Sequence, residues 1–152
     1  MTKTAADVRG FEHDWLACDA MGHVGMFATA GGSYAPVGYL QATELYGRAF
    51  QELLALPEQT EVLSAPLLKP GLTNTWRDLA LRGLFGFDGA FNGGAYQRVS
   101  VPRRPVLLSE LPASLGRVVR RITLPQACFA VDQPITEESL IVMDAALGAV
   151  LG

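Results

Sequence analysis

One segment of this sequence, from Asp14 to Gly32, constrains the fold more than any other. Two apolar-rich stretches flank the three-residue connection Ala20-Met21-Gly22. A connection of this length ending in glycine is typical of a type I turn whose last residue takes the left-handed position of a G1 bulge. Such a turn places Asp19 opposite His23 and fixes every later pair. The sequence therefore predicts an antiparallel hairpin with a defined register.

Both faces of this predicted hairpin are partly apolar. Because side chains alternate between the faces of a strand, Trp15 pairs with Phe27 on the face that also carries Asp19 and His23. Cys18 points to the opposite face, which is apolar as well. Two apolar faces favour a position in the interior of a sheet, where both sides are covered.

Helical and strand-like periods alternate through the rest of the chain. Apolar residues recur at three- and four-residue steps from about 38 to 56, which predicts an amphipathic helix that Pro57 ends. Residues 57–72 show no sustained period and indicate a connector. The other predicted elements are a helix at 74–82 capped by Thr73 or Asn74, a hairpin at 84–101, a short turn or helix near Ser109, strand-like stretches at 104–108, 117–124 and 127–131, and a closing helix at 137–150 for which a strand is the alternative.

A single domain over residues 1–152 accounts for these elements. The chain has 152 residues, of which 49% are hydrophobic and 18% charged, so it can bury a core without disulfides or metal. It shows no internal repeat and no change of composition along its length. The predicted fold class is α+β, with a mainly antiparallel sheet built from hairpins and two to three packed helices.

The sequence favours a cytoplasmic protein that makes no membrane contact. Its longest uncharged run, 20–43, contains Pro36 and several glycines, which is not typical of a membrane-spanning helix. The N-terminus lacks the apolar stretch of a secretory signal. Cys18 and Cys128 lie in apolar stretches, as reduced core cysteines do.

His23 and Asp19 are the candidate catalytic residues. They share one face of the hairpin, so the aspartate could orient the imidazole in a small hydrolase or transferase. Cys18 lies on the other face and is badly placed as a nucleophile. A hydrogen-bonded His/Asp pair beside a turn is also a common structural feature, and we favour that interpretation. Because no metal-ligand spacing and no phosphate-binding glycine motif occurs, we expect neither a metal nor another cofactor.

Six arginines in the second half of the chain form a candidate binding surface. Residues 97–131 hold six arginines and one acid, a local charge of +5, whereas the whole chain carries −3. That low total argues against a dedicated nucleic-acid binder. Guanidinium groups bind carboxylate and phosphate bidentately, so an arginine strip could receive an acidic protein partner or a phosphate-bearing ligand. The alternative is that they pair with the domain's own acids along strand edges. The candidates are Arg98, Arg103, Arg104, Arg117, Arg120 and Arg121.

Several stretches also resemble a known group of proteins. DWLACDAMGHVGMFATAGGSYAP, WRDLALRGLFGFDG and YQRVSVPRRPV are similar to segments of a family of small uncharacterised bacterial proteins, including structural-genomics targets from proteobacteria. The resemblance spans most of the chain. It implies an α+β domain and an association with immunity proteins encoded near polymorphic toxins. It supplies no catalytic residues.

We therefore expect a non-catalytic cytoplasmic protein-binding module of the immunity type. The loop aromatics Tyr34, Phe91 and Tyr96 are candidate anchors for an interface. Two alternatives stay open. One is a hydrolase or transferase that uses His23 and Asp19, and the other is an oligomeric accessory protein that associates through the apolar segment 139–151.

Overall fold

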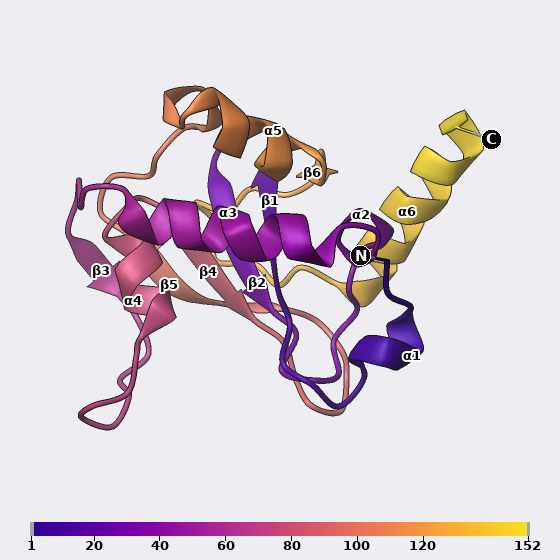
Figure 1. Ribbon diagram of the computed structural model, residues 1–152, viewed down its shortest axis with the longest axis horizontal. Coiled ribbons are helices and arrows are strands. Elements are labelled where there is room, and N and C mark those ends of the chain that lie inside the picture. Colours follow the sequence, from indigo (N-terminus) through magenta and orange to yellow (C-terminus); the bar gives the residue numbers. More distant parts are fainter. Residues whose placement is uncertain (1, 152) are drawn as a thin grey trace.

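A six-stranded mixed sheet organises the chain in the computed structural model, which describes residues 2–151 (Figure 1). The strand order is β3-β5-β4-β2-β1-β6. The strands are β1 (Asp14–Asp19), β2 (Val24–Ala28), β3 (Val62–Ser64), β4 (Phe85–Asp88), β5 (Gln97–Pro102) and β6 (Thr123–Leu124). The helices are α1 (Ala5–Val8), α2 (Val37–Leu40), α3 (Thr43–Ala55), α4 (Thr75–Ala80), the 3-10 helix η1 (Leu108–Glu110), α5 (Ala113–Arg120) and α6 (Glu137–Leu151).

The hairpin of β1 and β2 has the register predicted from the sequence. Trp15 lies opposite Phe27 and Cys18 opposite Val24. Gly22 has a φ of 82°, the left-handed conformation that the turn requires and that glycine adopts without strain. Both strands have neighbours on each side, since β6 pairs with β1 and β4 pairs with β2. The interior position of the hairpin is therefore confirmed.

The sheet is mainly antiparallel, but two of its strand pairs are parallel. β4 and β5 form the predicted second hairpin, and β3 adds an antiparallel edge strand. The pairs β2–β4 and β1–β6 run parallel. Parallel neighbours need a long crossover connection, which the helices between β2 and β4 supply. The α+β class is compatible with this sheet, whereas the finer prediction of a sheet built from hairpins holds only in part.

Two predicted helices are confirmed with changes in their bounds. The helix expected at 38–56 is interrupted, because Ala42 leaves the helical conformation between α2 and α3. The side-chain oxygen of Asn74 accepts the Arg77 backbone N–H at 3.1 Å and caps α4. The closing segment is the helix α6, so its strand alternative is wrong. The single-domain prediction covered residues 1–152, and the first and last of these lie outside the described residues.

The strand predicted at 117–124 is wrong for most of its length. Residues through Arg120 belong to the helix α5, and only Thr123 and Leu124 form a strand. Leu115, Val118 and Val119 are buried at helical spacing, whereas Arg117 and Arg120 are exposed. The stretch 127–131 forms no strand, and the connector 57–72 contains the short edge strand β3.

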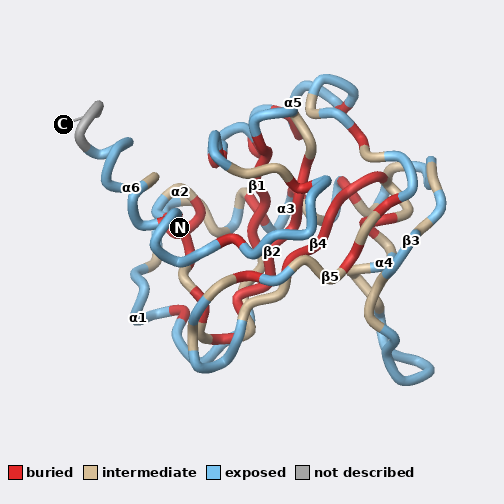
Figure 2. Tube along the Cα trace, turned by 180° about the vertical axis from the view of Figure 1, so that it is seen from behind, coloured by how far each residue is buried: buried red, intermediate tan, exposed pale blue. Residues whose placement is uncertain are grey.

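Different structures cover the two faces of the sheet. The helices α3 and α5 pack against β1 on one face (Figure 1). Residues 125–136, here called the Phe129 segment, cross the other face as a largely exposed coil, seen from behind in Figure 2. The Phe129 side chain is fully buried there, beside the rings of Phe27 and Phe87 at centroid distances of 5.8 and 5.1 Å. The buried Phe129 side chain thus anchors the coil that covers this face of the sheet.

Stacked aromatic rings fill the core below the Phe129 segment. Trp15 stacks on Phe27 at 4.1 Å, and Phe27 stacks on Phe87 at 4.7 Å. Tyr96 is buried against them and accepts a hydrogen bond from the Trp15 indole at 3.0 Å. The expectation that Tyr96 is an exposed anchor is therefore wrong. Phe91 remains 73% exposed, and Tyr34 is half-buried.

Candidate functional site

The Asp19 carboxylate is fully buried and is occupied by backbone groups. Its Oδ1 accepts the N–H groups of Met21 at 3.0 Å and His23 at 2.9 Å. Its Oδ2 accepts the N–H of Phe129 at 2.7 Å and lies 3.7 Å from Nδ1 of His23. Both oxygens therefore hold the turn and the Phe129 segment in place. Asp19 thus binds His23 through its backbone N–H, whereas the buried Nδ1 of the imidazole has no hydrogen-bond partner among the described residues.

Arg98 binds the other backbone polar group of Phe129. Its guanidinium donates to the Phe129 carbonyl at 3.0 Å, lies 5.9 Å from the Phe85 ring centroid and is 3.9 Å from the carboxylate of Asp132. Asp19 and Arg98 thus hold the N–H and the C=O of one residue. His23 also contacts the Phe85 ring, at 5.6 Å between centroids. The polar groups of Asp19 and Arg98 therefore converge on the backbone of Phe129, whose side chain is fully buried.

The glycine at position 25 leaves room for that side chain. A Cβ atom built on Gly25 would stand 3.0 Å from the Phe129 ring. Any larger residue would therefore displace the ring that closes this face. Cys18 points to the opposite face, where its sulfur lies 3.3 Å from the Thr123 hydroxyl. In residues 2–151 no three histidine, cysteine or acidic side chains are grouped as metal ligands would be.

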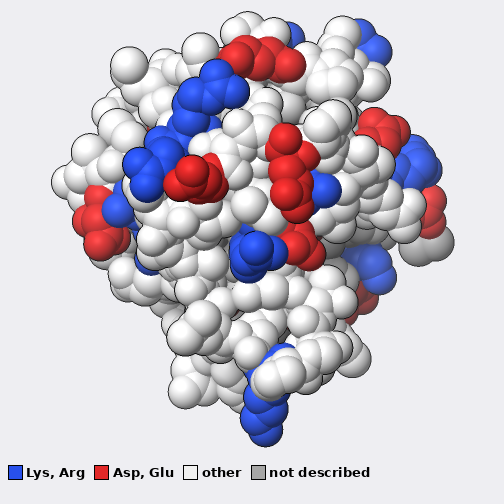
Figure 3. Space-filling view, turned by 90° about the vertical axis from the view of Figure 1, so that its left-hand side faces the viewer, with Lys and Arg blue, Asp and Glu red and all other residues white. Residues whose placement is uncertain are grey.

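The six candidate arginines divide into two groups. Arg98, Arg103 and Arg104 belong to β5 and the turn after it, where Arg103 pairs with Glu61 at 3.1 Å. Arg117, Arg120 and Arg121 belong to α5 and its C-terminal end. Basic and acidic side chains are interspersed over the face of the molecule that Figure 3 shows. The six do not form one strip along neighbouring strands.

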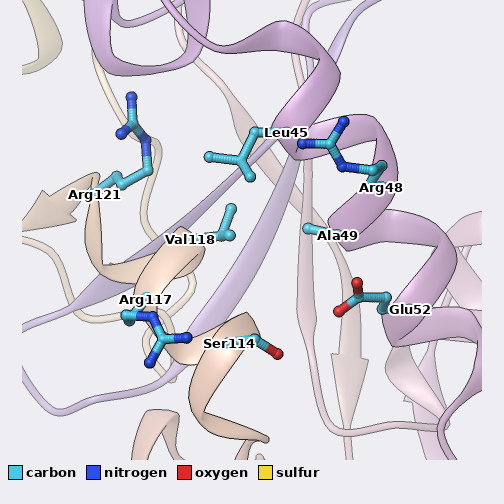
Figure 4. Close-up of a pocket in the computed structure, with 8 residues that line it drawn as sticks. All are labelled: Leu45, Arg48, Ala49, Glu52, Ser114, Arg117, Val118 and Arg121. Carbon is cyan, nitrogen blue, oxygen red and sulfur yellow. The ribbon is translucent and has the colours of Figure 1, made fainter.

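A hollow of about 370 Å³ lies between α3 and α5 (Figure 4). We call it the α3/α5 groove. Buried or half-buried apolar side chains lie between its walls, and exposed polar side chains line its rim. The lining residues are Leu45, Arg48, Ala49 and Glu52 from α3, and Ser114, Arg117, Val118 and Arg121 from α5 and its end.

The groove concentrates positive charge that the fold does not neutralise. Three guanidinium groups line it against the single carboxylate of Glu52. Among the described residues, none of Arg48, Arg117 and Arg121 lies within ion-pair distance of a carboxylate. Only Arg121 has a recorded side-chain hydrogen bond, to the Gly38 carbonyl at 3.1 Å. An anionic group in this groove would meet three guanidinium groups that no carboxylate of the described residues neutralises.

The buried Tyr46 hydroxyl adds a polar group beside the groove. It has no hydrogen-bond partner in the described chain, and Tyr46 itself is fully buried. Burial raises the pKa of Tyr46, while the nearby Arg121 charge acts in the opposite direction. The phenol therefore stays neutral near pH 7 and leaves the charge of the groove unchanged.

Sequence reasoning found only two of the three groove arginines. It placed Arg117 and Arg121 on a strand and did not include Arg48, which lies on α3. The exposed helical position of Arg48 was visible in the sequence. That it faces α5 depends on how two distant helices pack, and no local pattern carries this information.

Comparison with known proteins found no match. No protein-family model, no curated protein and no solved structure is similar to the chain. The resemblance to small bacterial proteins and to immunity proteins stays a prediction. Within residues 2–151, no helix combines the length and the apolar character needed to cross a bilayer.

Proposed function

We propose that this protein is a non-catalytic protein-binding module whose α3/α5 groove receives an acidic segment of a partner protein. The observation that carries the proposal is the set of three guanidinium groups without a carboxylate partner at the rim of one hollow. Arg98, by contrast, donates to the Phe129 carbonyl and lies 3.9 Å from the Asp132 carboxylate. An immunity protein, the class that the sequence resemblance suggests, would use such a surface to cover an acidic region of a toxin.

The Asp19 site supports this choice by contrast. A general acid or base needs access to substrate, and a carboxylate that orients it must hydrogen-bond to it. The Asp19 carboxylate is fully buried and binds three backbone N–H groups, and the buried Nδ1 of His23 lies 3.7 Å from it without a hydrogen bond. The charged groups that remain available for chemistry with another molecule lie in the groove.

Differential capture tests the proposal. The bait proteins are the native chain, the groove variant Arg48→Glu/Arg117→Glu/Arg121→Glu, and the matched variant Arg103→Glu/Arg104→Glu. Each is incubated with lysate of its own organism after a thermal melt has shown that it is folded. We expect a protein that the native chain and the matched variant retain and the groove variant loses, and that the purified native chain binds in calorimetry. Retention that does not depend on the groove arginines would overturn the proposal.

Self-association through α6 is a second candidate, because this helix extends away from the sheet (Figures 1 and 2). Ile141, Val142 and Leu147 on it are 46%, 60% and 46% exposed. Asp144, the only charged residue from 139 to 148, accepts hydrogen bonds from the Tyr34 hydroxyl and the Val37 N–H. Light scattering after size exclusion tests this candidate: a dimer that Val142→Glu converts to monomer is expected, and a monomeric native chain excludes it.

A further inference from the structure

The two walls of the α3/α5 groove show the same spacing. The lining residues of α3 are numbered 45, 48, 49 and 52, and those from the opposite wall are 114, 117, 118 and 121. Both sets follow the i, i+3, i+4, i+7 pattern of one helical stripe. Seven residue steps at 1.5 Å give a groove roughly 10 Å long, or two helical turns.

The polar and apolar side chains occupy different parts of the groove. Leu45, Ala49 and Val118 form its apolar part, between the two helices (Figure 4). Arg117 and Arg121 lie one turn apart on one wall, and Arg48 projects from the other wall. A ligand that uses the whole site must therefore present an apolar group with carboxylates on both sides of it.

The short length of the groove decides which backbone conformation can do this. About 10 Å of extended chain is three residues, and at most two of their side chains point to the same face. The same length of helix holds about seven residues, of which three or four share one face. Only the helix presents enough side chains to reach the arginines of both walls and the apolar part together.

We propose that the occupant of the groove is an amphipathic acidic helix of the partner protein, and this inference rests on the proposed function. Its apolar stripe packs on Leu45, Ala49 and Val118. Two carboxylates one turn apart bind Arg117 and Arg121, and a third acid on the opposite flank binds Arg48.

One end of the groove differs in charge from the other. Glu52 and Ser114 lie together at the end away from Leu45 and Arg121 (Figure 4). A carboxylate of the partner would be repelled by Glu52 on the α3 wall, so the acids of the partner helix face Arg48 on that wall and Arg117 and Arg121 on the other. An amide or a lysine suits the Glu52 end. The charge pattern thus gives the bound helix one direction.

Three fluorescent peptides of identical composition test this inference. The first is a side-chain-stapled helix with leucines on one stripe and glutamates one turn apart on both flanks. The second is stapled as well but has its leucines and glutamates redistributed so that no face is amphipathic. The third keeps the first sequence and exchanges two central L-residues for D-residues, so that no helix forms. Fluorescence anisotropy gives each Kd, and NMR shifts of the Leu45, Ala49 and Val118 amides locate the binding site.

We expect the first peptide to bind at least tenfold more tightly than the other two, because only it reaches all parts of the groove. The variant Arg117→Gln/Arg121→Gln should lose at least tenfold in affinity, and Arg103→Gln/Arg104→Gln should not. Glu52→Gln should tighten binding of a peptide that carries an additional acid at its Glu52 end. Thermal melts confirm that each variant is folded.

The failures of the two proposals can be told apart. If the unfolded acidic peptide binds in the groove as tightly as the helix, the helical occupant is wrong and the acidic-partner function stands. If no peptide binds and the capture experiment shows no groove-dependent partner, the function is wrong as well. Peptide binding that is unaffected by Arg117→Gln/Arg121→Gln overturns the assignment of the site.

Discussion

The two faces of the sheet use their charged side chains in opposite ways. On the face covered by the Phe129 segment, Asp19 and Arg98 are largely buried, and both bind the backbone of Phe129, while Asp19 also holds the turn of the first hairpin. On the helical face, Arg48, Arg117 and Arg121 surround a hollow and have no carboxylate partner among the described residues. A charged cluster therefore indicates function less by its residue types than by how completely the fold has used its hydrogen bonds.

The largest effect should come from removing the carboxylate that holds the covered face. Asp19→Ala leaves the buried Phe129 N–H and the partly buried N–H groups of Met21 and His23 without their acceptor. We expect a loss of about 5 kcal/mol in the free energy of unfolding, since an orphaned group costs about 1 to 3 kcal/mol, most when it is fully buried. Urea denaturation measures it. Asp132→Ala, at a carboxylate that is 76% exposed, is the control. Equal stability of the two variants would show that Asp19 does not organise this face.

Phe129→Ala should have the next largest effect. The ring is fully buried among aromatic neighbours, and truncating such a side chain costs about 4 kcal/mol, from lost burial and the cavity that remains. Phe91→Ala provides the comparison, because Phe91 is 73% exposed. Loss of protection from hydrogen exchange confined to residues 125–136 and the neighbouring strands should accompany the destabilisation. A variant as stable as the native protein would mean that the segment is not held by its ring.

The contrast between the faces also explains which features the sequence could predict. The register of the first hairpin follows from Gly22 and from strict alternation, both of which are local signals. The parallel contact between β2 and β4 depends on a crossover of more than fifty residues, and nothing local specifies it. In α5, the β-branched pair Val118 and Val119 favoured a strand, although Leu115 and Ile122 complete a helical period with them.

The candidate sites were predictable to different degrees for the same reason. The Asp19/His23 pair lies within one hairpin, so its structural role at a turn could be inferred from alternation and turn geometry. Its contact with Phe129 spans 110 positions, and no periodicity reports such a distance. The groove needs two helices to pack, one of which had been predicted as a strand. The local excess of arginines indicated Arg117 and Arg121 as binding residues. It did not show that they lie with Ser114 on one helix that forms a wall of the groove.

Asp14 is partly buried, between the fully buried Asp19 and the exposed arginines of the groove. Burial, followed by repulsion from Glu12 and Asp88, raises its pKa from 3.8 to about 6. Because the folded state then binds the proton more tightly than the unfolded state does, Asp14 lowers stability as the pH rises from about 4 through 6. Asp14→Asn should therefore stabilise the protein by about 3 kcal/mol at pH 8 and by much less near pH 4.

Urea denaturation of this variant at several pH values measures the difference. Glu58→Gln, at an exposed acid, should show no comparable dependence on pH. If the effect of Asp14→Asn is the same at pH 4 and pH 8, the Asp14 carboxyl does not titrate with a raised pKa. A destabilising effect at pH 8 would indicate that Asp14 has favourable partners, as Asp19 does.

The smallest effect on stability is expected in the groove, where the comparison can be made with one residue type. Arg117→Gln removes an exposed guanidinium without a recorded partner and should change the free energy of unfolding by less than about 0.5 kcal/mol. Arg98→Gln removes a donor to the Phe129 carbonyl whose side chain is only 14% exposed, and should cost about 2 kcal/mol. Binding should show the reverse order, with Arg117→Gln weakening the acidic helix and Arg98→Gln leaving its Kd unchanged. Equal costs in stability would mean that the fold depends on both arginines. The charged side chains of the groove would then serve the fold, as those of the covered face do.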